Sequence, residues 1–115
     1  MNELYGFLVD DVFIGFLQQV PELLEEINAF EGDLQILNNR LLFTLPALFE
    51  LTCNYVEKQH QQTPSRYRSD YLQFRKQLYN NPTNTVLQDK GGVVEIEKSD
   101  FDHDKSLYKL VFLER

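Results

Sequence analysis

Residues 93–113, VVEIEKSDFDHDKSLYKLVFL, decide the fold, because two runs of strand-forming residues flank a short turn rich in aspartate. In the first run, Val94 and Ile96 alternate with glutamates, which is typical of a strand with one face in water. The second run, over residues 106–114, is apolar on both faces and predicts a central or covered strand. A further strand is predicted over residues 85–88, so we expect the chain to end in a three-stranded antiparallel meander.

The turn between the two runs raises the question of a metal site, because Asp100, Asp102 and Asp104 stand at alternate positions, as in a calcium-binding loop. If Asp100 were the first loop position, Lys105 would replace the required glycine and Val111 the required glutamate. Aspartates also form tight turns by accepting hydrogen bonds from nearby backbone amides. The stretch therefore predicts a hairpin turn, with no metal and no cofactor.

The chain before residue 82 predicts about four helices, because apolar residues recur there at spacings of three and four. The predicted helices span residues 3–20, 21–31, 46–61 and 66–80. Pro21 suits the start of the second helix and Gly32 its end. In the fourth helix, one stripe of side chains is expected to be buried, namely Tyr67, Tyr71, Phe74 and Leu78.

Residues 34–45, between the second and third helices, fit two structures. Leu34, Leu37 and Leu41 have helical spacing, whereas the adjacent Asn38 and Asn39 fit the turn of a hairpin. The hairpin is favoured because asparagine tolerates the left-handed backbone that a two-residue turn needs. We therefore predict a two-layer α+β fold in which this hairpin extends the C-terminal sheet.

Composition limits the classes of protein to which the chain can belong. Its 115 residues have the length of one ordinary domain, and we expect residues 1–115 to fold as a single unit. No run of 18 apolar residues is present, so we do not expect the chain to span a membrane. The first residues carry acids and no base, unlike a secretory signal, and the single Cys53 cannot form an internal disulfide. We expect a cytoplasmic protein with Cys53 in its core.

Charge is spread unevenly along the chain, whose net charge is −7. Residues 1–33 contain eight acids and no base, whereas residues 63–90 contain five bases and only two acids. An acidic surface repels phosphate and attracts basic proteins, so nucleic-acid binding is disfavoured and a basic protein partner is favoured. The basic residues could instead pair with the acidic third, within the molecule or across a dimer.

The first predicted helix has a second feature, because Phe7 and Ile14 lie opposite its main apolar face, among Asp10 and Asp11. The pair either packs inside the domain or is presented to a partner. A two-faced helix and a possible free sheet edge together favour a homodimer.

Three functions follow as hypotheses. The first is a small protein-binding module of the inhibitor, immunity or adaptor type, whose predicted partner-binding residues are Phe7, Asp10, Asp11, Ile14, Glu22, Glu25 and Glu26. The alternative is a small-ligand-binding protein or small enzyme with a pocket between helices and sheet. The second alternative is weak nucleic-acid binding through the basic helix 66–80. Enzymatic activity is left open and disfavoured, since two histidines and no glycine-rich phosphate loop give no recognisable catalytic set.

Overall fold

The computed structural model describes residues 3–113. Its helical segments are α1 (Glu3–Phe7), η1 (Leu8–Phe13), α2 (Ile14–Leu17), α3 (Pro21–Ala29), α4 (Leu45–His60), α5 (Arg68–Asn80) and α6 (Thr83–Gln88). Its strands are β1 (Leu34–Leu37), β2 (Arg40–Phe43), β3 (Gly92–Lys98) and β4 (Leu107–Phe112). None of the helices within residues 3–113 is long and apolar enough to cross a membrane. Helices and an antiparallel sheet confirm the predicted α+β class.

The four strands form one sheet in the order β1-β2-β4-β3, and every neighbouring pair is antiparallel. Because β4 lies between β2 and β3, the prediction of a central last strand is confirmed. That strand was predicted to reach Glu114, which lies outside the described residues. The predicted hairpin over residues 34–45 is also confirmed, and β2 joins it to the C-terminal hairpin.

The turn of the first hairpin follows from its two asparagines. Asn38 and Asn39 have φ angles of 52° and 64°, so both adopt the left-handed backbone. Two successive left-handed residues are the geometry of the type I′ turn, whose twist matches that of the flanking strands. Local turn chemistry therefore fixes the register in which Leu37 pairs with Arg40.

The predicted strand over residues 85–88 is wrong, because this segment belongs to the short helix α6. Thr83 and Leu87 are buried on one side of α6, at the spacing of one helical turn. A helix of six residues gains little stability from its own hydrogen bonds and forms when packing holds one face. The meander consequently has two strands and the sheet four.

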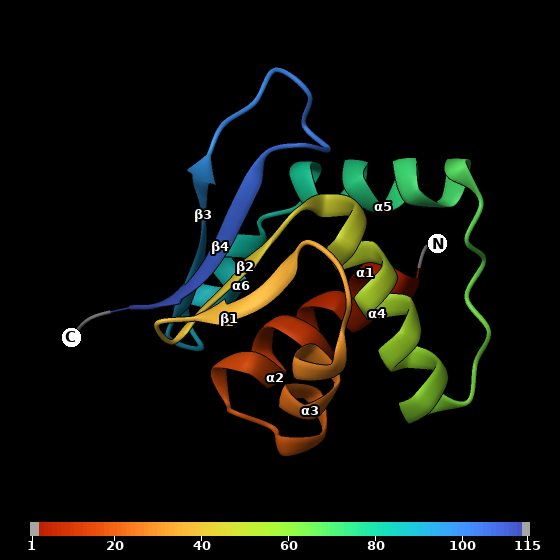
Figure 1. Ribbon diagram of the computed structural model, residues 1–115, viewed down its shortest axis with the longest axis horizontal. Coiled ribbons are helices and arrows are strands. Elements are labelled where there is room, and N and C mark those ends of the chain that lie inside the picture. The colour runs from red at the N-terminus through yellow and green to blue at the C-terminus, as the bar shows by residue number, and fades with distance from the viewer. Residues whose placement is uncertain (1–2, 114–115) are drawn as a thin grey trace.

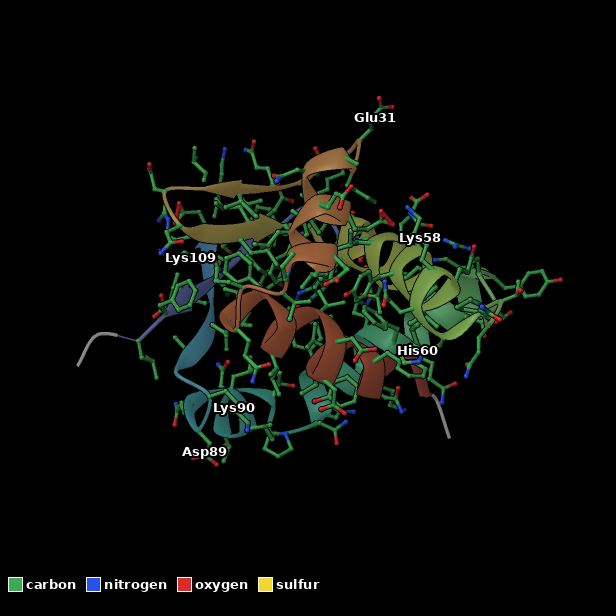
Figure 2. The ribbon with its side chains drawn as sticks, turned by 90° about the horizontal axis from the view of Figure 1, so that it is seen from below. Glu31, Lys58, His60, Asp89, Lys90 and Lys109 are labelled. Carbon is green, nitrogen blue, oxygen red and sulfur yellow. The ribbon has the colours of Figure 1, made fainter. Side chains whose placement is uncertain are left out.

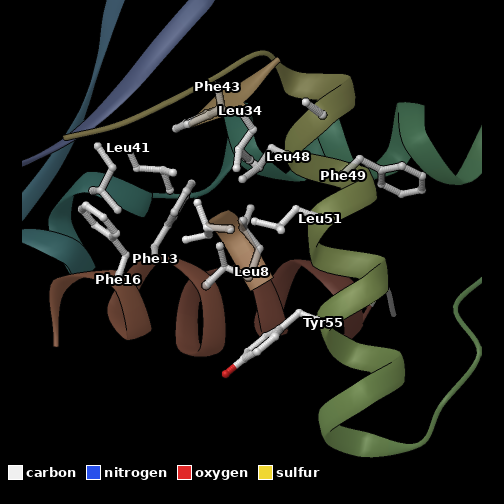
Figure 3. Packing of buried hydrophobic residues seen from close by; sticks show 14 of the residues in the cluster. Leu8, Phe13, Phe16, Leu34, Leu41, Phe43, Leu48, Phe49, Leu51 and Tyr55 are labelled. Atoms are coloured by element: carbon white, nitrogen blue, oxygen red, sulfur yellow. The ribbon is translucent and has the colours of Figure 1, made fainter. Parts of the chain in front are cut away.

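The hydrophobic core lies between the sheet and the helices (Figure 1). One face of the sheet supplies Leu41, Phe43, Tyr108 and Leu110, all of them buried. Figure 3 shows Leu41 and Phe43 of β2 near side chains of the first helical segment (α1, η1 and α2), such as Phe13, and of α4, such as Leu51. The helices thus form the second of the two predicted layers.

The first helical segment is wider in its middle than an α-helix, because η1 is a π-helix. Four of its six residues are buried, in the order Leu8, Val9, Val12 and Phe13. Phe7 and Ile14 flank this part, and both are half-buried and packed against the core. Of the two sequence interpretations of this pair, packing inside the domain is therefore the one that the structure supports.

The start of α5 differs from the prediction that Tyr67 continues the buried stripe. Tyr67 precedes the helix and its side chain is 77% exposed, whereas Tyr71 and Phe74 are buried as expected. The backbone N–H of Tyr67 donates to the carboxylate of Asp70 at 3.0 Å. This bond caps the helix and leaves the Tyr67 ring in solvent.

Candidate functional site

The acidic residues of α3 are positioned by its two buried leucine and isoleucine side chains. Leu23 and Ile27 are four residues apart and face the core, with exposed fractions of 0% and 2%. The opposite face of α3 therefore points to solvent, and Glu22 and Glu25 are exposed on it. Pro21 at the first turn begins the helix as the sequence predicts.

Two acids of the N-terminal third are bound by bases near the end of α4. Nζ of Lys58 donates to Oε2 of Glu26 at 2.8 Å, and Nε2 of His60 lies 2.6 Å from Oδ2 of Asp11. Cations suit the C-terminal turn of a helix, where the backbone carbonyls leave a partial negative charge. The end of α4, where Figure 2 labels Lys58 and His60, thus contacts two acids that are far apart in the sequence.

The pKa of Tyr55 is affected by acids from the same two segments of the chain. Burial raises the pKa of Tyr55, and the negative charges of Asp11, Glu22 and Glu26 raise it further. Figure 3 shows its hydroxyl pointing away from the packed cluster. The hydrogen bond that Lys58 donates to Glu26 raises the pKa of Lys58, and the charge of Glu25 acts in the same direction. The charges of these acids thus act on two residues in the last turns of α4.

We call Asp11, Glu22, Glu25 and Glu26 the acidic group. Four carboxylates lie against only two basic side chains among the described residues, Lys58 and His60, so an excess of negative charge remains. The described part of the chain shows no ion pair for Glu22 or Glu25, both of which are exposed. The surface can therefore accept further cationic groups.

A groove of about 400 Å³ between α3 and α4 continues the acidic group. It contains Glu26 and, in addition, three glutamates that the sequence did not single out: Glu31, Glu50 and Glu57. Glu50 and Glu57 are seven residues apart on α4, and this spacing was the available signal that they share one helical face. Phe30 supplies an apolar part of the lining. Such a groove can hold the stem and the charged head of a long basic side chain.

The other predicted binding residues take different positions. Phe7 stacks on the ring of His60, with 4.5 Å between ring centroids, and so supports the contact between His60 and Asp11. Ile14 packs against the core, and Asp10 is exposed next to Asp11. The structure thus brings Asp11 and the three glutamates of α3 together. Phe7 contacts His60, and Ile14 packs against the core.

The bases of the predicted nucleic-acid helix are largely used inside the molecule. Nη1 of Arg75 donates to Oδ1 of Asp104 at 2.8 Å, and Arg68 lies 3.6 Å from the same carboxylate. Arg66 donates to Glu57. These bases pair with carboxylates of the β3–β4 loop and of α4. Within residues 3–113 they do not pair with the acidic N-terminal third, which was one interpretation of the sequence. Fewer free charges remain for phosphate, which weakens the nucleic-acid hypothesis.

The aspartate turn forms as the sequence predicts, by bonding its own backbone. Oδ1 of Asp100 accepts from the N–H of Asp102 at 3.0 Å, and Oδ1 of Asp102 accepts from the N–H of Asp104 at 2.9 Å. Within residues 3–113, no group of three or more His, Cys, Asp or Glu side chains is arranged to hold a metal ion. The carboxylates of Asp100 and Asp102 thus stabilise the backbone of the loop through the two hydrogen bonds given above.

Comparison of the chain with protein-family models, with curated proteins and with solved structures found no match.

Proposed function

We propose that this protein is a small binding module that occupies the surface of a basic partner protein, as inhibitors, immunity proteins and adaptors do. The observation that carries the proposal is the convergence of Asp11, Glu22, Glu25 and Glu26 around the last turns of α4. Acids from two separate segments meet there, beside an open groove with three more glutamates. Complementary charge of this kind steers a basic protein toward its binding surface and fixes its orientation.

The contacts of Lys58 and His60 indicate how a partner would bind. Both side chains lie on carboxylates at hydrogen-bond distance, although the Lys58 side chain is 65% exposed. The Lys58 side chain can move away into water, but the Glu26 side chain is only 11% exposed, so a partner arginine that replaces Lys58 must take over its hydrogen bond to Glu26. An arginine also binds a carboxylate through two parallel hydrogen bonds, which lysine cannot do. We therefore expect an arginine-rich segment to bind better than a lysine-rich one.

The proposal includes the cytoplasmic location expected from the sequence.

Self-association stays a prediction, and its basis has changed. Phe7 and Ile14 pack inside the domain, so the remaining support for a homodimer is that β1 and β3 are edge strands, each paired on one side only within residues 3–113. A solution mass measured by light scattering tests it directly.

The binding experiment measures the fluorescence anisotropy of a labelled oligoarginine peptide titrated with the protein, at about 20 mM and about 300 mM salt. We expect binding at low salt that weakens at high salt. The double substitution Glu22→Gln and Glu25→Gln changes the net charge from −7 to −5 and should weaken binding about tenfold, on the order of 1.4 kcal/mol. An oligolysine peptide of equal length should bind less tightly.

The matched control removes two other exposed acids, through Asp89→Asn and Glu95→Gln, and has the same net charge of −5. Figure 2 shows Asp89 far from Lys58 and His60. If binding depends on the acidic group, this control should bind like the unchanged protein. Equal loss in both double variants would mean that net charge alone attracts the peptide, and the proposal would then be wrong.

A further inference from the structure

A second pocket, of about 350 Å³, lies where the sheet passes α6 and the end of α5. Its apolar lining includes Phe43, Leu45, Leu78, Val94 and Ile96. This volume lies near the lower end of the range of about 300–1,000 Å³ that is usual for small-molecule pockets. The pocket shares no residue with the groove between α3 and α4, so it forms a separate site.

The walls of this pocket are held in place by hydrogen bonds. The side chain of Asn84 donates to the carbonyl of Val94 at 3.0 Å and accepts from the N–H of Val94 at 2.8 Å, which fixes α6 to β3. Oγ1 of Thr83 lies 2.6 Å from the hydroxyl of Tyr5, which fixes α6 to the first helical segment. The pocket is therefore formed before any ligand arrives, and binding need not order its walls.

A pair of tyrosine hydroxyls supplies one polar part of the lining, beside the side chains of Asn81, Thr83, Asn84 and Thr85. Tyr79 and Tyr108 both line the pocket, and their hydroxyls are hydrogen-bonded to each other. Nδ1 of His103 lies 3.3 Å from the Tyr79 hydroxyl. Burial and the bond to Tyr108 raise the pKa of Tyr79, so its phenol is neutral at physiological pH. A phenol both donates and accepts, and so the pair retains capacity for one more hydrogen bond.

Charge excludes some classes of ligand. Among the described residues that line the pocket, none is lysine, arginine or histidine. Glu95 is one of them, but it alternates with Val94 and Ile96 along β3 and pairs in register with Lys109, so its side chain extends from the opposite face of the sheet. An anionic ligand would enter an apolar site without a counter-charge, at a high desolvation cost.

Apolar surface remains in water at the mouth of the pocket. Ile96 is 59% exposed and Tyr79 is 49% exposed, although both contribute to the lining. A ring that covers them removes this surface from water and gains its hydrophobic free energy. We infer that the pocket binds a small uncharged molecule with an aromatic ring and one hydroxyl or N–H group, which bonds to the Tyr79–Tyr108 pair.

The test compares 2-naphthol with 2-naphthoate, which has the same rings but carries a negative charge. Each is titrated into the ¹⁵N-labelled protein at neutral pH while amide chemical shifts are recorded. We expect 2-naphthol to shift amides near the pocket, in residues 78–85 and 94–96, and to bind at least tenfold more tightly than 2-naphthoate. Scattered shifts, or equal affinity for the two compounds, would overturn the inference.

Two substitutions to aspartate locate the site. Ile96→Asp places a carboxylate at the mouth and should weaken 2-naphthol binding at least tenfold. The matched control is Val86→Asp, since Val86 is 43% exposed on α6 but is not part of the lining. This variant should bind 2-naphthol as tightly as the unchanged protein does. If Ile96→Asp does not fold, Thr85→Asp replaces it, because Thr85 is an exposed lining residue of α6. Unchanged binding in a folded mouth variant would refute the pocket as the site.

Discussion

At the scale of single residues, Asp104 fastens the β3–β4 loop to α5. Its carboxylate accepts hydrogen bonds from the Tyr71 hydroxyl and from Arg75, and its side chain is 17% exposed. Burial by itself raises the pKa of Asp104, but the hydrogen bonds from Tyr71 and Arg75, with the charges of Arg75 and Arg68, outweigh burial and hold the pKa below its ordinary value. One carboxylate thereby joins two segments that are about thirty residues apart in the sequence.

We predict that Asp104→Asn lowers the free energy of unfolding at pH 7 by about 2 kcal/mol, because it removes charged hydrogen bonds. Since the folded-state pKa is depressed, the contribution of this carboxylate is fully present above the unfolded value of about 3.9 and is lost as the pH falls through the folded value. Urea unfolding of both proteins between neutral and acidic pH should show their difference shrinking below about pH 4. The exposed Asp89→Asn serves as control, and a difference independent of pH would contradict this account.

At the scale of elements, the two hairpins illustrate how local sequence sets structure. The turn at Asn38 and Asn39 needs two left-handed residues, and the sequence supplies two that tolerate this backbone. By contrast, α6 was predicted as a strand because a segment of a few residues has too little periodicity to identify it. Its helix is held by the burial of Leu87 and by the bonds of Asn84 to β3, which join residues in different elements.

Two substitutions of Asn39 in the hairpin turn should change the free energy of unfolding in opposite directions. Asn39 has a φ of 64°, so Asn39→Gly should raise the free energy of unfolding by roughly 0.5 kcal/mol, since glycine adopts this backbone freely. Asn39→Ala should lower it by roughly 1 kcal/mol, because the alanine side chain clashes in the left-handed conformation. Thermal and urea unfolding measure both changes. Equal stabilities for the two variants would mean that the turn has another geometry.

At the scale of the whole molecule, Cys53 reports whether the core opens. Its side chain is buried in the middle of α4, in agreement with the sequence prediction of a core cysteine. Burial raises the pKa of Cys53 to about 11, although the nearby charge of Arg66 acts in the opposite direction. The thiolate is the reactive form, so the thiol is protected both by its protonation and by the packing around it.

We therefore predict that Cys53 reacts with a disulfide reagent such as dithionitrobenzoate at least 100-fold more slowly in the native protein at pH 8 than in concentrated urea. The native rate should rise with added urea along the global unfolding curve, because exposure of α4 requires opening of the shared core. Rapid labelling in the absence of urea would show that α4 leaves the core more easily than its burial indicates.

The sequence by itself determined the α+β class, the first hairpin, the central last strand, the aspartate turn and the acidic surface of α3. Each of these depends on residues close together in the chain, through periodicity, turn chemistry or helix-end preferences, and such signals are visible without tertiary contacts. The same reasoning gave Asp11, Glu22, Glu25 and Glu26 as candidate binding residues. It also found the apolar pair Phe7 and Ile14, but it could not choose between a packed and an exposed position for them.

Tertiary structure alone decided the helical state of α6, the packing of Phe7 on His60, the groove with Glu31, Glu50 and Glu57, and the pocket beside β3. It also decided which acids the bases of α5 contact, since Arg75 reaches Asp104 and not the N-terminal third. In each case the contacting residues are distant in the chain, and their meeting depends on how whole elements pack around one core. Periodicity shows which face of an element is apolar, whereas packing decides what that face and its charged edges meet.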